Sequence, residues 1–217
     1  MTRVPGKVTV VDYGSGNLFS VTRALEKCGA TVAVSGLAGD VVAADRLVLP
    51  GVGAFAAGMQ GLRERGLAEA IVEYAQCGRP LLGICLGMQM LFATSTEFGE
   101  HEGLGLIAGR ILPIEPRDEA GAPLKVPHIG WSPLMEAPGS AGWADSVLRR
   151  LRPGTPAYFV HSYTAVPAVE GDRLADTYYG SCRVSAAVRK GHITGCQFHP
   201  EKSAGAGLAV IESFLEV

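Results

Sequence analysis

The sequence has few charged residues and almost no imbalance between them. Charged side chains make up 18% of its 217 residues, and 19 basic against 21 acidic residues leave a formal net charge of −2 at pH 7. A chain without a basic excess has no long-range field that draws it to nucleic acid or to an anionic membrane surface. We therefore expect neither of these among its partners.

Long apolar runs are also missing. A helix that spans a bilayer needs about 20 consecutive apolar residues, whereas the uncharged stretch 80–96 is shorter and is interrupted by Gly83, Gly87 and Gln89. The first residues leave no room for an apolar signal region before Asp12. The sequence therefore predicts a cytoplasmic protein whose apolar stretches form a core.

Cysteine is scarce, and its spacing fits no cysteine-rich scaffold. The odd number of five, without any C-x-x-C pair, argues against a disulfide framework and against a cysteine-rich zinc module. At least one thiol is therefore expected to be free for chemistry. The cysteines lie at positions 28, 77, 85, 182 and 196.

The residues that are abundant are typical of a globular chain with many tight turns. Hydrophobic residues make up 47% of the chain, which has 29 glycines, and its length fits one large core, so we expect a single domain over 1–217. In the first half, short β-branched runs alternate with apolar residues at helical spacing. The expected strands are 7–11, 31–34, 46–49 and 80–84, and the expected helices are 18–28, 54–75 and 86–93.

This alternation predicts an α/β fold, with a doubly wound, mostly parallel sheet and helices on both faces. From about Arg110 the pattern changes to short extended runs separated by turns, so the C-terminal half is expected to be rich in strands. These strands would extend the same sheet or add a smaller antiparallel layer. A closing amphipathic helix is expected at 208–215.

The sharpest local signal is Gly83-Ile84-Cys85-Leu86-Gly87, a G-x-nucleophile-x-G pattern between a predicted strand and a predicted helix. In such an elbow, a strained turn holds the nucleophile, and the helix N-terminus favours the thiolate over the thiol. Cys85 is therefore the candidate nucleophile. The alternative is a buried structural cysteine in a glycine-rich turn, since many free cysteines are small hydrophobes.

A cysteine nucleophile needs a base, and His199 at the end of the last predicted strand is the candidate. Glu201 lies two residues further on, and Pro200 stiffens the backbone between them, so the carboxylate can turn back to orient the imidazole. Cys85, His199 and Glu201 would then form a catalytic triad. Alone, the tripeptide is more often a turn at a strand end, but its combination with the cysteine elbow favours catalysis.

Acyl chemistry also needs backbone donors that stabilise an oxyanion. One is the amide of Leu86, and the other would come from the loop Gly51-Val52-Gly53, whose glycines allow close approach to a substrate. Both turns follow strands at the carboxyl edge of the predicted sheet, where ligands bind in this architecture. Taken alone, the glycine loop could be an ordinary strand-to-helix turn.

Two other kinds of site are disfavoured by the spacing. The loop at 14–16 follows the first strand as a dinucleotide loop would, but Phe19 occupies the third glycine position and no acidic residue ends the second strand. His192, Cys196 and His199 have the types of metal ligands, but no second cluster completes a coordination shell. We therefore expect no cofactor and no metal.

Several motifs, in a fixed order over nearly the whole chain, resemble one known family. GICLGMQ at 83–89 and the His-Pro-Glu sequence at 199–201 are marks of the class I, triad-type glutamine amidotransferases. Within that class the chain resembles the glutaminase subunits of imidazole glycerol phosphate synthases, with one departure at Ser132, where asparagine is expected. The other motifs that carry the resemblance are YGSGN at 13–17, PGVGAF at 50–55, HIGW at 128–131, YFVHSY at 158–163 and QFHPEKS at 197–203.

The resemblance implies glutamine hydrolysis through a covalent intermediate. Cys85 would attack the side-chain amide carbon, His199 would protonate the departing ammonia, and water would cleave the glutamyl thioester, while Glu201 orients His199. Glu97 could instead be a solvated carboxylate at a helix end, and Gln89 a polar residue on a helix face. The residues implied to bind the substrate are Gly51, Gln89, Glu97, Ser162 and Tyr163.

The resemblance also implies a heterodimer. Ammonia released into neutral water becomes ammonium and loses its nucleophilicity, so it should travel along a protected path to a partner. The family's partner is a (β/α)8-barrel cyclase subunit, which combines ammonia with a phosphoribulosyl-formimino carboxamide ribonucleotide. The products are imidazole glycerol phosphate, for histidine synthesis, and an aminoimidazole carboxamide ribonucleotide. The implied contact residues, each of which could instead be a local cap, a core aromatic or a solvated charge, are Asn17, Trp131, Tyr158 and Lys202.

Two alternatives stay open on the sequence alone. One is another glutaminase or γ-glutamyl hydrolase on the same fold, such as the glutaminase subunit of anthranilate or aminodeoxychorismate synthase. The other is a regulatory binding module that has kept the fold and lost turnover. An electrophilic glutamine analogue that fails to label Cys85 would favour this second alternative.

Overall fold

The computed structural model describes residues 6–217. The expectation that no signal region precedes Asp12 rests in part on residues 1–5, which lie outside the described residues. Within residues 6–217, no helix combines the length and the apolar character that a membrane span requires.

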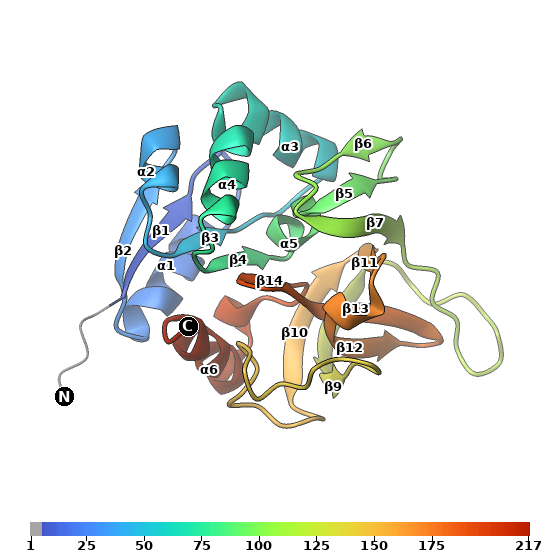
Figure 1. Ribbon diagram of the computed structural model, residues 1–217. Coiled ribbons are helices and arrows are strands. Elements are labelled where there is room, and N and C mark those ends of the chain that lie inside the picture. The colour runs from blue at the N-terminus through green and yellow to red at the C-terminus, as the bar shows by residue number, and fades with distance from the viewer. Residues whose placement is uncertain (1–5) are drawn as a thin grey trace.

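Eight strands form the largest sheet, in the spatial order β2 (Thr31–Ser35), β1 (Lys7–Val11), β3 (Leu47–Leu49), β4 (Leu81–Ile84), β14 (Ile193–Cys196), β13 (Cys182–Lys190), β12 (Arg173–Tyr179) and β9 (Met135–Glu136). The first five strands pair in parallel, whereas β13, β12 and β9 continue the sheet in antiparallel fashion (Figure 1). The predicted α/β fold is therefore confirmed, and the strand-rich half does extend the same sheet.

Helices cover both faces of this sheet. On one face lie α1 (Leu18–Lys27) and α6 (Ala204–Phe214), which bury Leu25 and Phe214 in the same apolar cluster. On the other face lie α2 (Ala38–Val42), α3 (Phe55–Glu64) and α4 (Leu67–Gln76), and the apolar cluster there includes the fully buried Tyr74 (Figure 1). Apolar residues recur at helical spacing on the inner side of α1 and α4, so each helix buries one face against the strands.

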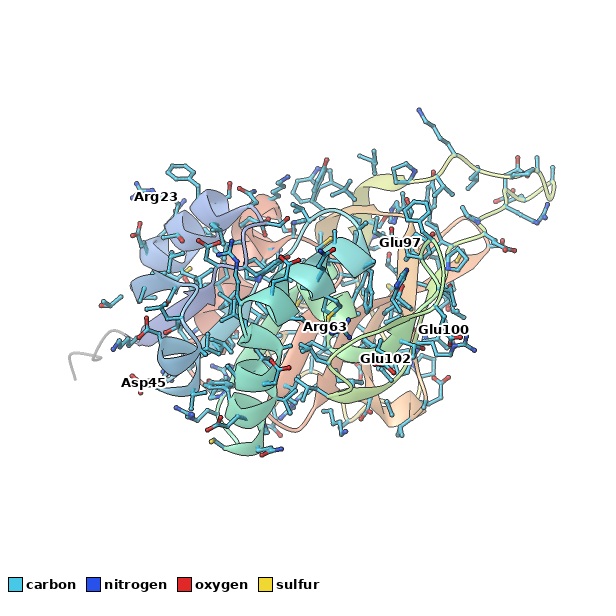
Figure 2. The ribbon with its side chains drawn as sticks, turned by 90° about the horizontal axis from the view of Figure 1, so that it is seen from above. Arg23, Asp45, Arg63, Glu97, Glu100 and Glu102 are labelled. Atoms are coloured by element: carbon cyan, nitrogen blue, oxygen red, sulfur yellow. The ribbon has the colours of Figure 1, made fainter. Side chains whose placement is uncertain are left out.

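A smaller layer completes the fold. It consists of a four-stranded sheet and a separate antiparallel pair. Arg63 of α3 donates a hydrogen bond to the Glu102 carbonyl at 2.9 Å, and Figure 2 shows Arg63 near the middle of the molecule, with Glu102 on the side away from Arg23 and Asp45. The four strands are β11 (Tyr163–Pro167), β7 (Ile107–Pro113), β5 (Phe92–Ser95) and β6 (His101–Glu102), and the pair is β10 (Pro156–His161) with β8 (His128–Pro133). This layer is not the purely antiparallel layer offered as the alternative, because β5 and β7 pair in parallel.

Three of the expected helices are wrong in their bounds, and one of them, expected over 208–215, is α6, which begins at Ala204 and ends at Phe214. The helix expected over 54–75 is two helices, because Gly66 between α3 and α4 has a left-handed backbone with φ of +64°. The helix expected over 86–93 ends early as α5 (Leu86–Met90), and the chain continues at once into β5. Two short 3-10 turns, η1 (Glu170–Asp172) and η2 (Pro200–Lys202), complete the elements.

Candidate active site

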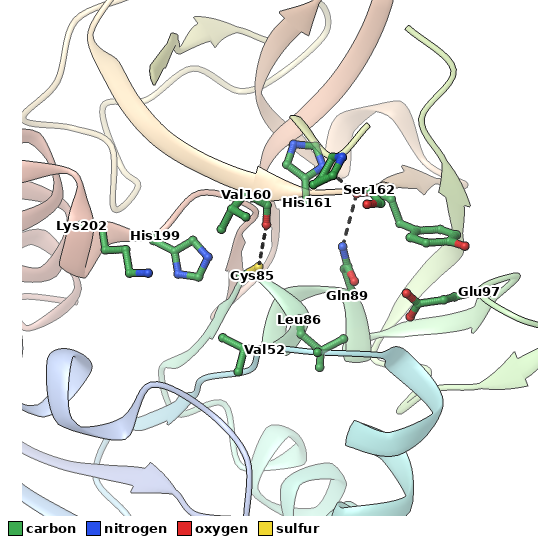
Figure 3. Close-up of a pocket in the computed structure, with 13 residues that line it drawn as sticks. Val52, Cys85, Leu86, Gln89, Glu97, Val160, His161, Ser162, His199 and Lys202 are labelled. Atoms are coloured by element: carbon green, nitrogen blue, oxygen red, sulfur yellow. Dashed lines mark hydrogen bonds between the residues drawn. The ribbon is translucent and has the colours of Figure 1, made fainter. Parts of the chain in front are cut away.

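Two neighbouring parallel strands bring the candidate nucleophile and base together. Ile84, the last residue of β4, is paired with Cys196, the last residue of β14. The backbone amide of Cys85 donates to the Cys196 carbonyl at 2.7 Å. Cys85 and His199 therefore leave the sheet at the same carboxyl edge, although one comes from mid-chain and the other from near its end (Figure 3).

Cys85 has the strained backbone of a nucleophile elbow. Its φ of +53° and ψ of −112° lie in a region that residues with a side chain rarely adopt. The next turn requires glycine, since a Cβ at Gly87 would lie 1.8 Å from the carbonyl oxygen of Leu49. Because α5 has only five residues, its dipole supports a thiolate less than the longer expected helix would.

His199 and Glu201 form a buried pair beside the thiol. Nδ1 of His199 lies 2.8 Å from Oε1 of Glu201, and their side chains are only 3% and 1% exposed. Burial lowers the pKa of His199, but its interactions with Cys85 and Glu201 outweigh burial and raise this pKa to about 9. Figure 3 shows the imidazole next to the sulfur. At neutral pH the ring therefore carries the proton that a thiolate–imidazolium pair requires.

Cys85 and His199 line a pocket of about 290 Å³, near the lower end of the range for small-molecule sites. Val52, Gly53 and Leu86, the residues expected to supply oxyanion donors, line this pocket. Gly51 lies directly against the elbow, where an added Cβ would be 2.7 Å from the Gly87 amide nitrogen. The glycine loop and the elbow are therefore in backbone contact.

The other residues expected to bind substrate, Gln89, Glu97, Ser162 and Tyr163, line the same pocket, and the first three are labelled in Figure 3. Gln89 Nε2 donates to the Tyr163 carbonyl at 3.3 Å. Glu97 follows β5 instead of ending a helix, and its Oε2 accepts a hydrogen bond from the Phe55 amide at 2.5 Å. The carboxylate is thus held against the first turn of α3 and borders the pocket.

The four residues expected at a partner surface differ in their surroundings. Asn17 caps α1, because its side chain accepts a hydrogen bond from the backbone of the first turn. Trp131 is 53% exposed, and its ring meets Tyr158 edge-on at 5.9 Å. The Tyr158 carbonyl accepts the His199 amide at 2.9 Å, and the exposed Lys202 lines the pocket. An aromatic pair, the exposed Trp131 and the half-buried Tyr158, therefore adjoins the candidate base.

A buried polar relay, which was not predicted from the sequence, lies next to the pocket. Nε2 of His128 is 2.9 Å from Ser132 Oγ, Nδ1 of His128 is 3.0 Å from Nε2 of His161, and Nδ1 of His161 is 2.9 Å from the Tyr163 carbonyl. Burial lowers the pKa of His128 and, together with His128, that of His161 to about 4. The signal in the sequence was that both histidines belong to extended motifs, HIGW and YFVHSY, which contribute to β8 and β10 and pair at His128 and His161.

Gln197 was also missed as a site residue. It is completely buried, and its Nε2 lies 3.7 Å from Cys85 Sγ.

In the described part of the chain, no group of three or more His, Cys, Asp or Glu side chains is placed to hold a metal ion.

Comparison with known families gives a match over nearly the whole chain. The family model for class-I glutamine amidotransferases matches residues 9–216. The chain belongs to this family. The elbow at Cys85 and the His199–Glu201 pair both lie within the matched residues of the amidotransferase model.

Amidotransferase relatives are similar over almost their whole length. The imidazole glycerol phosphate synthase subunit HisH 1 of Legionella pneumophila (strain Lens) is 46% identical over 210 residues, which are 97% of this chain and 99% of that protein. The HisH subunit of Bacillus licheniformis is 46% identical over 207 residues, covering 95% and 94% of the two chains. The structure of PurLQS from Thermotoga maritima matches with a TM-score of 0.71 at 20% identity, covering 98% and 99%, and this likeness supports the amidotransferase fold.

Proposed function

We propose that this chain is the glutaminase subunit of an imidazole glycerol phosphate synthase. It hydrolyses glutamine to glutamate and ammonia, and the ammonia serves histidine biosynthesis. The observation that carries the proposal is the meeting of Cys85 with the buried His199–Glu201 pair at one pocket. The chain is also 46% identical, over nearly its full length, to a protein named as a subunit of this synthase.

In the first half of the reaction, the Cys85 thiolate attacks the side-chain amide carbon of glutamine and forms a C–S bond. The carbonyl oxygen becomes an oxyanion, which accepts hydrogen bonds from the Leu86 amide and from an amide of the Val52–Gly53 turn. As the C–N bond breaks, the His199 imidazolium gives its proton to the leaving nitrogen, and ammonia departs. The raised pKa of His199 suits this acid role at neutral pH.

In the second half, water hydrolyses the glutamyl thioester. His199, now neutral, accepts a proton from the water as its oxygen attacks the thioester carbon, and the oxyanion donors act again. The C–S bond breaks, the electron pair returns to the Cys85 sulfur, and glutamate leaves. Glu201 orients the imidazole and stabilises its cation in both halves.

The partner in this proposal is a (β/α)8-barrel cyclase subunit that forms a heterodimer with the chain. The exposed Trp131 and its neighbour Tyr158 support a contact surface beside the site, because Tyr158 bonds to the backbone of His199. Lys202 would lie at the same face, whereas the capping role of Asn17 accounts for that residue without a partner. Ammonia released at Cys85 would then pass to the cyclase without entering water.

We further propose that residues 1–217 form one amidotransferase domain, which works in the cytoplasm. The family model spans residues 9–216 without a division. A cytoplasmic location follows from the proposed role, because the chain, its partner and a nucleotide substrate must share one compartment.

The test is to combine the chain with the cyclase subunit, glutamine and the nucleotide substrate, and to measure glutamate and imidazole glycerol phosphate. Cys85→Ala should abolish both products with glutamine and leave product formation from ammonium salts intact. Cys77→Ala, which alters an exposed thiol, is the matched control and should behave like the unmodified chain. Glutamate release by Cys85→Ala would refute the mechanism, and activation by the large subunit of anthranilate synthase in place of the cyclase would refute the pathway.

A further inference from the structure

The sulfur of Cys85 lies between groups that favour opposite protonation states. The Val160 carbonyl, 3.8 Å from Sγ, is an acceptor that only the protonated thiol can satisfy. Nε2 of Gln197, 3.7 Å from Sγ, is a donor, and a donor favours the thiolate. Since the five-residue α5 contributes little dipole, the thiolate depends on side-chain donors.

The Tyr163 carbonyl fixes which end of each glutamine amide faces which neighbour. A carbonyl only accepts, so Gln89 must present its NH₂ group to it. The same Nε2 atom donates its second proton to Oε1 of Gln197 at 3.0 Å. With its oxygen engaged in this way, Gln197 has its NH₂ group left for the Cys85 sulfur. The hydrogen bonds of Gln89 therefore fix the Gln197 side chain with its NH₂ group towards the Cys85 sulfur.

We propose that Gln197 is a further catalytic residue, whose side-chain amide donates a hydrogen bond to the Cys85 thiolate and is oriented for this by Gln89. The inference rests on the proposed glutaminase function and adds to it a group outside the triad. The thiolate is present twice in the reaction, before it attacks the amide and when it leaves the thioester. The donor acts at both points.

The fold holds Gln197 rigidly in this position. It follows directly after β14, so the strand pairing that brings His199 to Cys85 also brings Gln197 there. Its side chain is completely buried, and its backbone amide donates to the Ala186 carbonyl at 2.9 Å. A buried, hydrogen-bonded amide needs no reorganisation when charge develops on the sulfur.

The test measures how fast iodoacetamide alkylates Cys85 across a range of pH, read on the Cys85 peptide by mass spectrometry of the full chain. This small, neutral reagent reports the thiolate without requiring glutamine to bind. Gln197→Leu removes the donor and should slow alkylation at pH 7 about tenfold, with the midpoint of the pH profile raised by about one unit. Gln89→Leu should shift the profile in the same direction by less, because Gln197 stays but loses its orientation.

Gln60→Leu, on the exposed surface of α3, is the matched control and should leave the profile unchanged. Should Gln197→Leu fail to fold, Gln197→Glu keeps the shape of the side chain and should slow alkylation at least as much, since a carboxylate faces the sulfur. An unchanged profile in either folded Gln197 variant overturns the inference. If the Gln197 variants shift the profile but the unmodified chain hydrolyses no glutamine together with the cyclase subunit, the proposed function is wrong and the Gln197–Cys85 contact stands.

Discussion

His199 and His161 are buried to a similar degree and line the same pocket, with exposed fractions of 2% and 6%. Burial lowers the pKa of His199, but interactions with Cys85 and Glu201 raise it to about 9. At the end of β10, burial and the neighbouring His128 lower the pKa of His161 to about 4, and the charge of His199 adds to this lowering. Two similar side chains in one pocket are thus driven to opposite charge states.

The comparison shows that the partners of a histidine, more than its burial, decide what it can do. His199 has a carboxylate on one side and a thiol on the other, so it can hold and transfer a proton. His161 meets a backbone carbonyl and a second imidazole, so it stays neutral with its proton on Nδ1. The parallel part of the main sheet carries the reacting groups, whereas β10 lines the pocket with Val160 and His161.

Glu201→Gln should produce the largest effect, because it removes the charge that distinguishes His199 from His161. The amide keeps the shape of the side chain but no longer stabilises the imidazolium, so the pKa of His199 should fall. In the assembled enzyme, kcat for glutamate release should drop about 100-fold or more. KM for glutamine should change little, since Glu201 is shielded from solvent behind His199. Glu64→Gln on α3 serves as the control, and an unaltered kcat in Glu201→Gln would contradict the role given to the pair.

The two histidines should also give the free energy of unfolding opposite pH dependences. The folded pKa of His161 lies below its ordinary value of 6.5, so its contribution is complete above pH 6.5 and is lost as pH falls towards 4. The folded pKa of His199 lies above 6.5, so its contribution is complete below that pH and is lost as pH rises towards 9. Each histidine changes the free energy of unfolding by at most about 3 kcal/mol over its pH range.

Urea unfolding at a series of pH values checks this prediction. His161→Gln should flatten the loss on the acid side and leave the loss on the alkaline side in place. His128 adds to the acid side with the same sign, because burial lowers its pKa as well. An acid limb that is equally steep with and without His161 would show that other groups cause it.

The part of the site that lies in contiguous residues could be predicted from the sequence. The elbow around Cys85 could be predicted from its flanking glycines and from its place between a predicted strand and a predicted helix. The observed β4 begins one residue after the expected strand at 80–84. The parallel strands were found because each is a short apolar run that ends in a turn. Their shared carboxyl edge then placed Cys85 near His199.

The remaining parts depend on information that no local pattern contains. The relay needs His128 to face His161, which is a matter of register between two strands that are far apart in the sequence. The mistaken helix over 86–93 arose because Leu91 and Phe92 are fully buried, and a buried apolar run fits a helix as well as a strand. The break at Gly66 was missed because glycine inside an apolar pattern is compatible with a continuous helix.

Ser132→Ala should have the smallest effect. It tests the hydrogen bonds that run from Ser132 through His128 to His161. Since Nδ1 of His128 donates to His161, its Nε2 is bare and accepts the Ser132 hydroxyl proton at 2.9 Å. Removing that donor should lower the free energy of unfolding by about 1 kcal/mol. It should also make the acid-side loss smaller and end it at a higher pH, because without the hydroxyl the folded pKa of His128 lies closer to its ordinary value. Ser140→Ala, in a surface loop, is the control. If Ser132→Ala kept both the stability and the acid limb of the unmodified chain, the tautomer assigned to His128 would be wrong.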